Sequence, residues 1–237
     1  MSSSEPTGDS CDLFGKRVVV RPSVSQRQLP LPLAWSSASQ PSIEFRLGDS
    51  NREAVQHIQG FADWRDPASI LVGPRGSGRS TLGQMFVEAG GGELVDGLAG
   101  ADEDALFHAW NRAHGAGHRL LIIADDVAEV AAVRLPDLAT RLSTAPIVTI
   151  SSPDACLVRD LIEHLLVRRG LIPAPQLASY VAARLDRSYV AVHAAVDAID
   201  AASLASGRQP GIRLARAALI DAGLFDATGD DEAMESS

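Results

Sequence analysis

The sequence predicts an α/β P-loop fold. A parallel sheet carries a phosphate-binding loop at the end of one strand, and a small all-helical domain follows the sheet. Between residues 43 and 152, short apolar segments alternate with segments of helical periodicity, a pattern typical of a parallel α/β sheet. One apolar segment leads straight into a glycine-rich loop at 73–80. After Pro153 the periodicity is helical only. Together these three observations define the predicted fold class.

The elements of the sheet region follow in order. Asp49 is placed to cap a helix that ends near Gly60, and 69–72 is a short apolar strand. The next expected elements are a helix at 80–89, a strand at 93–96, a helix at 102–114, a strand at 120–124, a helix at 135–142 and a strand at 147–150. Glycine and proline breaks then separate four expected helices at 154–169, 174–185, 188–205 and 212–222.

Composition divides the chain into four parts. Residues 1–42 form a leader rich in serine, proline and charge, and 225–237 form an acidic tail; both are expected to be flexible. Between them lie the P-loop core at 43–152 and the helical lid domain at 153–224. Within the leader, 28–33 is an apolar peptide whose prolines prevent a helix and favour an extended form.

Charge and hydropathy exclude several classes of function. The 237 residues carry a formal net charge of −9 and only 5% aromatic residues, so we expect no direct DNA binding. No apolar run approaches the length of a membrane span, and the first ten residues lack the features of a signal peptide. Cys11 and Cys156 lack metal-ligand spacing and are expected to be free thiols. The sequence therefore predicts a cytoplasmic protein.

The glycine-rich loop reads GPRGSGRS and matches the P-loop spacing at every position but one. Its candidate nucleotide-binding residues are Gly73, Gly76, Gly78, Arg79, Ser80 and Thr81. The Ser80 hydroxyl occupies the position of a magnesium ligand. Arg79 stands where lysine is usual, and its larger, planar head is not equivalent to lysine in a tight loop. We expect weakened handling of ADP or ATP with Mg²⁺; the alternative is a glycine-rich turn without nucleotide.

A P-loop ATPase also needs an acidic residue at a strand end to hold the metal. Two places compete for this role. Asp125 and Asp126 follow the apolar strand at 120–124 and fit the local pattern well. Asp96 follows the strand at 93–96, but glycine stands in the position of its second acid. From the residues alone, Asp125 and Asp126 are favoured, with a solvated strand end as the alternative.

Three stretches together resemble one known family. They are the peptide QLPLPL at 28–33, the P-loop, and the segment RLPDLATRL at 134–142. In combination they are similar to the Hda/DnaA-like AAA+ family, the regulatory inactivators of the bacterial replication initiator. The resemblance extends from about residue 28 to 224 and implies an AAA+ core with a helical lid, in a divergent and shortened member.

The resemblance implies two partners. Gln28, Leu29, Leu31 and Leu33 match the peptide with which such proteins bind the sliding clamp of DNA polymerase III. Arg141 matches the arginine finger that reaches the nucleotide of a neighbouring subunit, here the initiator DnaA. The resemblance ends near residue 224, so we expect no counterpart of the initiator's DNA-binding domain.

The same alignment moves the metal position to Asp96, because 104–108 is similar to the family segment that follows its acidic strand. The strand at 120–124 then becomes the sensor strand, with Asp125 and Asp126 as the alternative acidic pair. One strand-helix unit of the family is missing between the P-loop helix and Asp96. Val190 stands where the family has a nucleotide-sensing arginine.

The leading interpretation is therefore an adaptor that binds the clamp and promotes ATP hydrolysis by the initiator, with little or no ATPase activity of its own. This would regulate DNA replication initiation negatively. A self-contained P-loop ATPase and a pseudo-ATPase scaffold on the clamp are the alternatives. The histidines lack ligand spacing and are expected to have structural or surface roles; they are His57, His108, His114, His118, His164 and His193.

Overall fold

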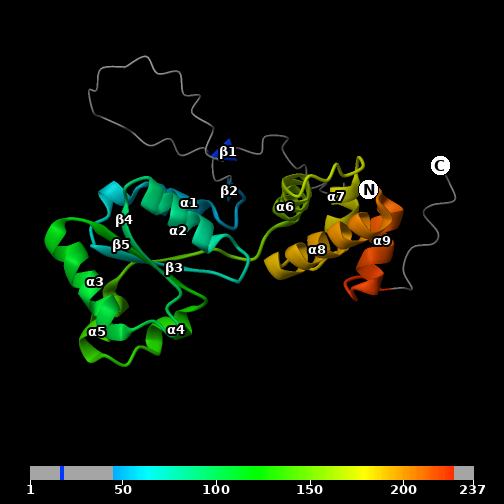
Figure 1. Cartoon of the computed structure of the whole chain (residues 1–237). Coiled ribbons are helices and arrows are strands. Elements are labelled where there is room, and N and C mark those ends of the chain that lie inside the picture. Colours follow the sequence, from blue (N-terminus) through cyan, green and yellow to red (C-terminus); the bar gives the residue numbers. More distant parts are fainter. Residues whose placement is uncertain (1–16, 19–44, 227–237) are drawn as a thin grey trace, which may run out of the picture.

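A computed structural model describes residues 17–18 and 45–226 (Figure 1). Its centre is a four-stranded parallel sheet with the strand order β4-β5-β3-β6. These strands span Ala68–Val72 (β3), Gly92–Asp96 (β4), Arg119–Ala124 (β5) and Ile147–Thr149 (β6). The predicted fold class is confirmed. A separate two-stranded antiparallel pair joins β1 (Arg17–Val18) to β2 (Phe45–Arg46).

Helices cover both faces of the sheet (Figure 1). On one face lie α1 (Arg52–Gln59) and α2 (Arg79–Glu88), packed on the β3 and β5 side chains Leu71, Leu121 and Ile123. On the other face lie α3 (Glu103–Ala116), α4 (Val127–Ala131) and α5 (Pro136–Thr144). They pack on Ile70, Leu120 and Ile122, which alternate along β3 and β5 with the residues of the first face. Successive strand residues point to opposite faces, so both faces of these central strands are apolar.

The chain passes from α2 directly into β4 through a short turn at 89–91. Gly92 makes this entry feasible: its φ is 131°, and a Cβ there would lie 2.1 Å from the Arg119 carbonyl oxygen of β5. β4 pairs with β5, while β5 pairs with β3, so β5 separates the P-loop strand from β4. The sheet thus contains no additional strand-helix unit between α2 and β4, as the sequence predicts.

The C-terminal region is a helical unit with a core of its own. It contains α6 (Ala155–Arg168), α7 (Leu177–Ala182), α8 (Tyr189–Ser206) and α9 (Ile212–Asp221). Its buried residues include Ile162, Val181, Val196 and Leu219, one from each helix. Asp154 and Ser188 cap α6 and α8 through their side chains. The helix expected at 174–185 is shorter than predicted, because Gln176 takes a left-handed conformation at its start.

Cys156 lies in the first turn of α6 and is disulfide-bonded, so the expectation of a free thiol at this position is wrong. The cysteine count and spacing alone gave no reason to expect a bond. Within residues 17–18 and 45–226, no helix is both long and apolar enough to cross a membrane.

Candidate functional site

The P-loop occupies the turn between β3 and α2, at the carboxyl end of the sheet. Gly76 and Gly78 have φ angles of 79° and 87°, in the left-handed region that favours glycine. Gly78 is the N-cap residue of α2, so the first N–H groups of that helix open onto the loop. A loop with converging N–H groups at a helix start is suited to bind phosphate.

This geometry predicts that Gly78→Ala destabilises the fold. A left-handed alanine costs about 1–2 kcal/mol, and a Cβ at Gly78 would lie 2.6 Å from Cε2 of Phe45. We expect the free energy of unfolding to fall by roughly 2 kcal/mol and the Tm by about 4–8 °C. Thermal unfolding followed by circular dichroism measures both quantities.

Gly115→Ala is the matched control for that experiment. Gly115 lies within α3, and nothing would meet an added Cβ within 4 Å. Alanine is the better helix former there, so its Tm should stay level or rise slightly. An equal loss of stability in both variants would contradict a strained conformation at Gly78.

Arg79 does not extend freely into the loop. Its guanidinium donates to the Ala124 carbonyl oxygen at the end of β5, and its Nη2 lies 2.5 Å from Oδ1 of Asp125. The Arg79 side chain is only 10% exposed. The hydrogen bond from Arg79 holds the pKa of Asp125 below its usual value, so this carboxylate is charged at neutral pH. The atypical P-loop residue is therefore tied to the neighbouring strand.

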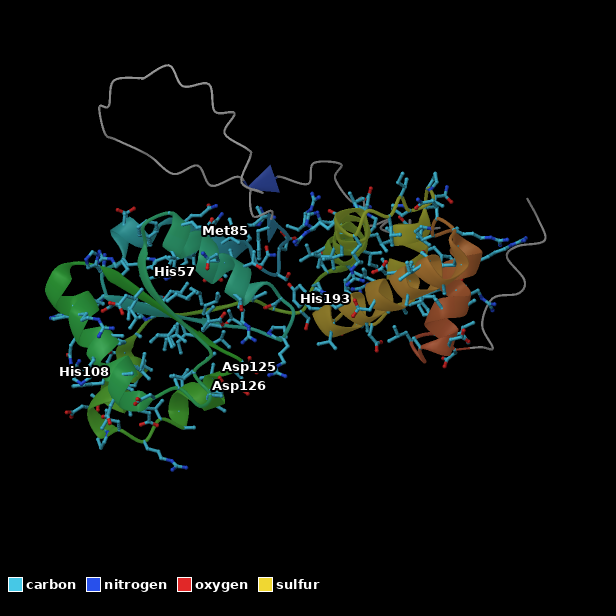
Figure 2. The ribbon with its side chains drawn as sticks, viewed as in Figure 1. His57, Met85, His108, Asp125, Asp126 and His193 are labelled. Carbon is cyan, nitrogen blue, oxygen red and sulfur yellow. The ribbon has the colours of Figure 1, made fainter. Side chains whose placement is uncertain are left out.

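The predicted acidic residues separate in space. Asp125 also pairs with Arg75, whose Nε lies 3.4 Å from Oδ2, so it contacts two arginines of the loop. Asp126 instead caps α4 by accepting a hydrogen bond from the Glu129 backbone N–H. Figure 2 shows Asp125 and Asp126 at the end of the sheet that faces the helical domain. Asp125 is thus an ion-pair partner of the loop, and Asp126 has a structural role.

Asp96 lies at the exposed end of β4 and is aligned with Ile123 of β5. Since adjacent strands are about 4.8 Å apart, Asp96 is about 10 Å from the P-loop strand across the sheet. It shares the carboxyl edge with Asp125 but does not line the cavity beside the loop. Within the described ranges, no group of three or more His, Cys, Asp or Glu residues is arranged to hold a metal ion.

A cavity of about 960 Å³ lies beside the P-loop, between the core and the helical domain. Ser80 and Thr81 line it, as do residues from β2, α6 and α8. Side-chain contacts join the domains around it. The Ser50 hydroxyl is 3.2 Å from the Tyr189 hydroxyl, and Nη2 of Arg46 is 3.0 Å from Nδ1 of His164. The volume is in the range typical of small-ligand sites.

His193 is the site residue that the sequence analysis missed. It projects from α8 toward the core (Figure 2), and its Nε2 lies 3.2 Å from the Gly76 carbonyl oxygen of the P-loop. Val190, in the predicted sensor position one turn earlier, is 59% exposed and does not line the cavity. The sequence signal that could have indicated His193 is its helical spacing from Tyr189. The two residues are four positions apart, so they lie on the same face of the helix, and both line the cavity.

Arg141 lies away from this cavity, on α5. Its Nη1 is 2.6 Å from Oδ1 of Asn111, and its guanidinium stacks 4.4 Å from the centre of the Phe107 ring. Leu138 and Leu142 face the core as the helical spacing predicts. Arg141 is half-buried against α3 and forms no ion pair with an acidic residue in the described part of the chain. The peptide of Gln28, Leu29, Leu31 and Leu33 lies outside the described residues.

Solved structures of other proteins share this architecture. Domain III of the replication initiation protein DnaA from Thermotoga maritima matches with a TM-score of 0.62 and 15% identity, over 75% of this chain and 94% of that one. The fold is the AAA+ fold of DnaA. DnaA from Aquifex aeolicus with bound AMPPCP matches with a TM-score of 0.50 and 14% identity, over 65% of this chain and 63% of that one.

At the sequence level, an uncharacterized protein of Haemophilus influenzae is 26% identical over 218 residues. The alignment spans 77% of this chain and 94% of that protein. No protein-family model matches the chain.

The residues fit a bound nucleotide in part. The left-handed glycines and the open start of α2 suit the phosphates, and Ser80 is exposed beside them. Arg79, by contrast, is turned toward Ala124 and Asp125 rather than held ready for a phosphate. The site is therefore shaped to bind phosphate, but its cation is already paired.

Proposed function

We propose that this protein is an Hda-like adaptor that binds the sliding clamp of DNA polymerase III and promotes ATP hydrolysis by DnaA, thereby inhibiting replication initiation. The observation that supports this best is a DnaA-type AAA+ fold whose P-loop arginine is held by Asp125. AAA+ domains of similar shape can pack side by side through related surfaces. A member with impaired nucleotide chemistry is suited to act on the nucleotide of its neighbour.

Arg141 is the residue proposed to act in trans. A guanidinium supplied by a partner stabilises the charge of the phosphoryl-transfer transition state and raises the rate about 10³- to 10⁵-fold. Arg141 is held by Asn111 and Phe107 through contacts that keep its charge uncompensated. Such contacts orient the side chain without neutralising it, so the proposal requires only that Arg141 leave the Phe107 ring when DnaA docks.

The leader is proposed to provide the tether. Gln28, Leu29, Leu31 and Leu33 would insert into a groove of the clamp as an extended peptide. A peptide of this kind binds modestly alone, and the second contact with DnaA raises the avidity of the whole assembly. We retain the division into leader 1–42, core 43–152, lid 153–224 and tail 225–237, and a cytoplasmic location, as parts of this proposal.

For nucleotide, we expect ADP to be the ligand and the intrinsic ATPase rate to lie far below about 1 per second, an ordinary enzyme rate. Asp125→Asn should free Arg79 for phosphate contact and raise ADP affinity several-fold. Asp126→Asn removes the same charge from the next residue but retains the α4 cap, so ADP affinity should not change. Calorimetric titration with ADP distinguishes them; equal affinities in both variants would contradict the ion-pair argument.

A pseudo-ATPase scaffold on the clamp is the second candidate. It is favoured by one observation: Arg141 already has partners on α3, as a purely structural arginine would. In that case the clamp would still bind the leader, but DnaA would be unaffected.

A binding experiment tests the proposal. Immobilised clamp is incubated with the full chain and with DnaA in its ATP-bound form, with and without ADP. We expect the full chain to bind the clamp directly and DnaA to be retained only when the chain is present, more strongly with ADP. Failure to retain DnaA under both conditions would exclude the adaptor function, whereas retention of the chain alone supports the scaffold.

A further inference from the structure

Helix α8 carries two side chains that reach from the helical domain to the core. Tyr189 and His193 are four residues apart and therefore lie on one face of the helix. The Tyr189 hydroxyl is 3.2 Å from the Ser50 hydroxyl. Nε2 of His193 is 3.2 Å from the Gly76 carbonyl oxygen, and Figure 2 shows His193 at the side of the helical domain that faces the core. The P-loop therefore has a direct partner on the helical domain.

The close approach of α8 to the loop requires glycine at position 76. A Cβ on Gly76 would lie 2.9 Å from Cδ2 of His193, a distance shorter than Cβ atoms ordinarily keep, and 3.5 Å from Cβ of Tyr189. The φ angle of Gly76 is 79°, which glycine adopts without strain. The conformation of the loop and its contact with the helical domain thus depend on the same residue.

The hydrogen bond from His193 fixes the orientation of one peptide group in the loop. A carbonyl oxygen only accepts, so the imidazole N–H of His193 donates to Gly76. The peptide group between Gly76 and Ser77 is planar and trans, so its carbonyl and its N–H point in opposite directions. The Ser77 N–H donates to the Pro74 carbonyl oxygen at 3.2 Å and closes a turn over 74–77. His193 therefore holds this turn from the side of the helical domain.

The turn over 74–77 sets the position of the groups that are suited to bind phosphate. It leads into Gly78, the N-cap residue of α2, and the first N–H groups of that helix have no partner within the helix. Such a loop binds phosphate when its N–H groups converge. Because Arg79 is paired with Asp125, the backbone donors carry a larger share of the binding. A side chain that holds the turn thus controls phosphate affinity without touching the phosphate.

We propose that His193 is a positioning residue through which the helical domain holds the P-loop in its phosphate-binding conformation. The inference rests on the proposed nucleotide binding by the loop and specifies how that binding is regulated. Movement of α8 away from the core breaks the contact with Gly76 and weakens phosphate binding. Since linkage between two equilibria is reciprocal, a diphosphate bound to the loop also strengthens docking of the helical domain.

Calorimetric titration of the full chain with ADP and with inorganic pyrophosphate tests the effect on affinity. His193→Ala should weaken both ligands by about three- to tenfold, as expected for the loss of one hydrogen bond. The two losses should be equal, because the change affects the phosphate donors that both ligands use. His193→Gln keeps a side-chain N–H donor and should restore both affinities to within about twofold.

Val190→Ala is the control on the same helix, since Val190 is 59% exposed and does not line the cavity. Both affinities should be unchanged in this variant, and thermal unfolding verifies that all three variants fold. Equal losses in His193→Ala and Val190→Ala would overturn the inference, as would a failure of His193→Gln to restore binding. A loss confined to ADP would also overturn it, because His193 would then contact the nucleoside rather than position the loop.

Hydrogen exchange at the Ser77 amide in the ligand-free chain tests the positioning itself. This N–H is bonded to Pro74, so its exchange requires the turn to open. His193→Ala should accelerate the exchange about three- to tenfold, whereas His193→Gln and Val190→Ala should not. An unchanged rate in His193→Ala would overturn the inference. If the unmodified chain binds neither ADP nor pyrophosphate, the proposed nucleotide site is wrong, and the exchange rate still decides whether His193 holds the turn.

Discussion

Arg141→Ala is expected to abolish the stimulation of ATP hydrolysis by DnaA. On the proposed function, Arg141 provides transition-state charge stabilisation in trans, so its loss should lower the stimulated rate by about 10³-fold or more. The measurement is hydrolysis of DnaA-bound ATP in the presence of clamp loaded on DNA. Clamp binding by the variant should be unchanged, because the leader peptide is separate from α5.

The same variant should remain folded. Arg141 donates one hydrogen bond to Oδ1 of Asn111 and makes a partly exposed stacking contact with Phe107, which together are worth about 1–2 kcal/mol. Arg134→Ala is the control, because Arg134 is an exposed arginine just before the same helix. If Arg141→Ala still stimulates DnaA as well as Arg134→Ala does, Arg141 is a structural arginine and the scaffold is the better interpretation.

Replacing Gln28 and Leu31 together with alanine should reduce clamp affinity by about 100-fold or more. Anchor side chains of a short peptide each contribute more than about 1–2 kcal/mol when truncated, and no second clamp contact is proposed to compensate. Surface plasmon resonance with immobilised clamp measures the loss. The Tm should not change, because both substitutions lie in the leader, outside the core and lid.

Ser36→Ala with Ser37→Ala provides the control in the same leader, beyond the peptide. Clamp affinity should be retained in this pair. Unchanged affinity in the Gln28 and Leu31 variant would show that the peptide is only a proline-rich spacer. The chain would then need another surface to reach the clamp, and the tether would have to be abandoned.

The fold was largely predictable, because its signals are local. The β3 and β5 segments are continuous apolar runs that lead into polar turns, and such runs form buried parallel strands. Asp102 was expected near the start of α3 and caps it through its side chain. The α4 turn was missed, since 127–131 is a single short helix without helical periodicity. The strand order depends on contacts between distant segments, which periodicity does not specify.

The site was predictable only in part. The glycines of the P-loop follow from a fixed spacing, and the left-handed conformations of Gly76 and Gly78 agree with it. Two contacts of the site were not predictable, because they join residues far apart in the sequence. The Arg79–Asp125 ion pair spans 46 positions, and the contact of His193 with Gly76 spans 117. Asp125 was proposed as a metal ligand from its position after a strand. The same position lets it pair with Arg79, and only the structure reveals that contact.

The most direct test of the adaptor function is the lifetime of ATP bound to DnaA in a defined mixture. DnaA is loaded with labelled ATP and incubated with the full chain and ADP, with and without clamp assembled on DNA. We expect rapid conversion to ADP only when the chain and the clamp are both present, and essentially no hydrolysis by the chain alone. ATP that persists equally in all mixtures would contradict the adaptor function, as would hydrolysis that the chain performs without DnaA.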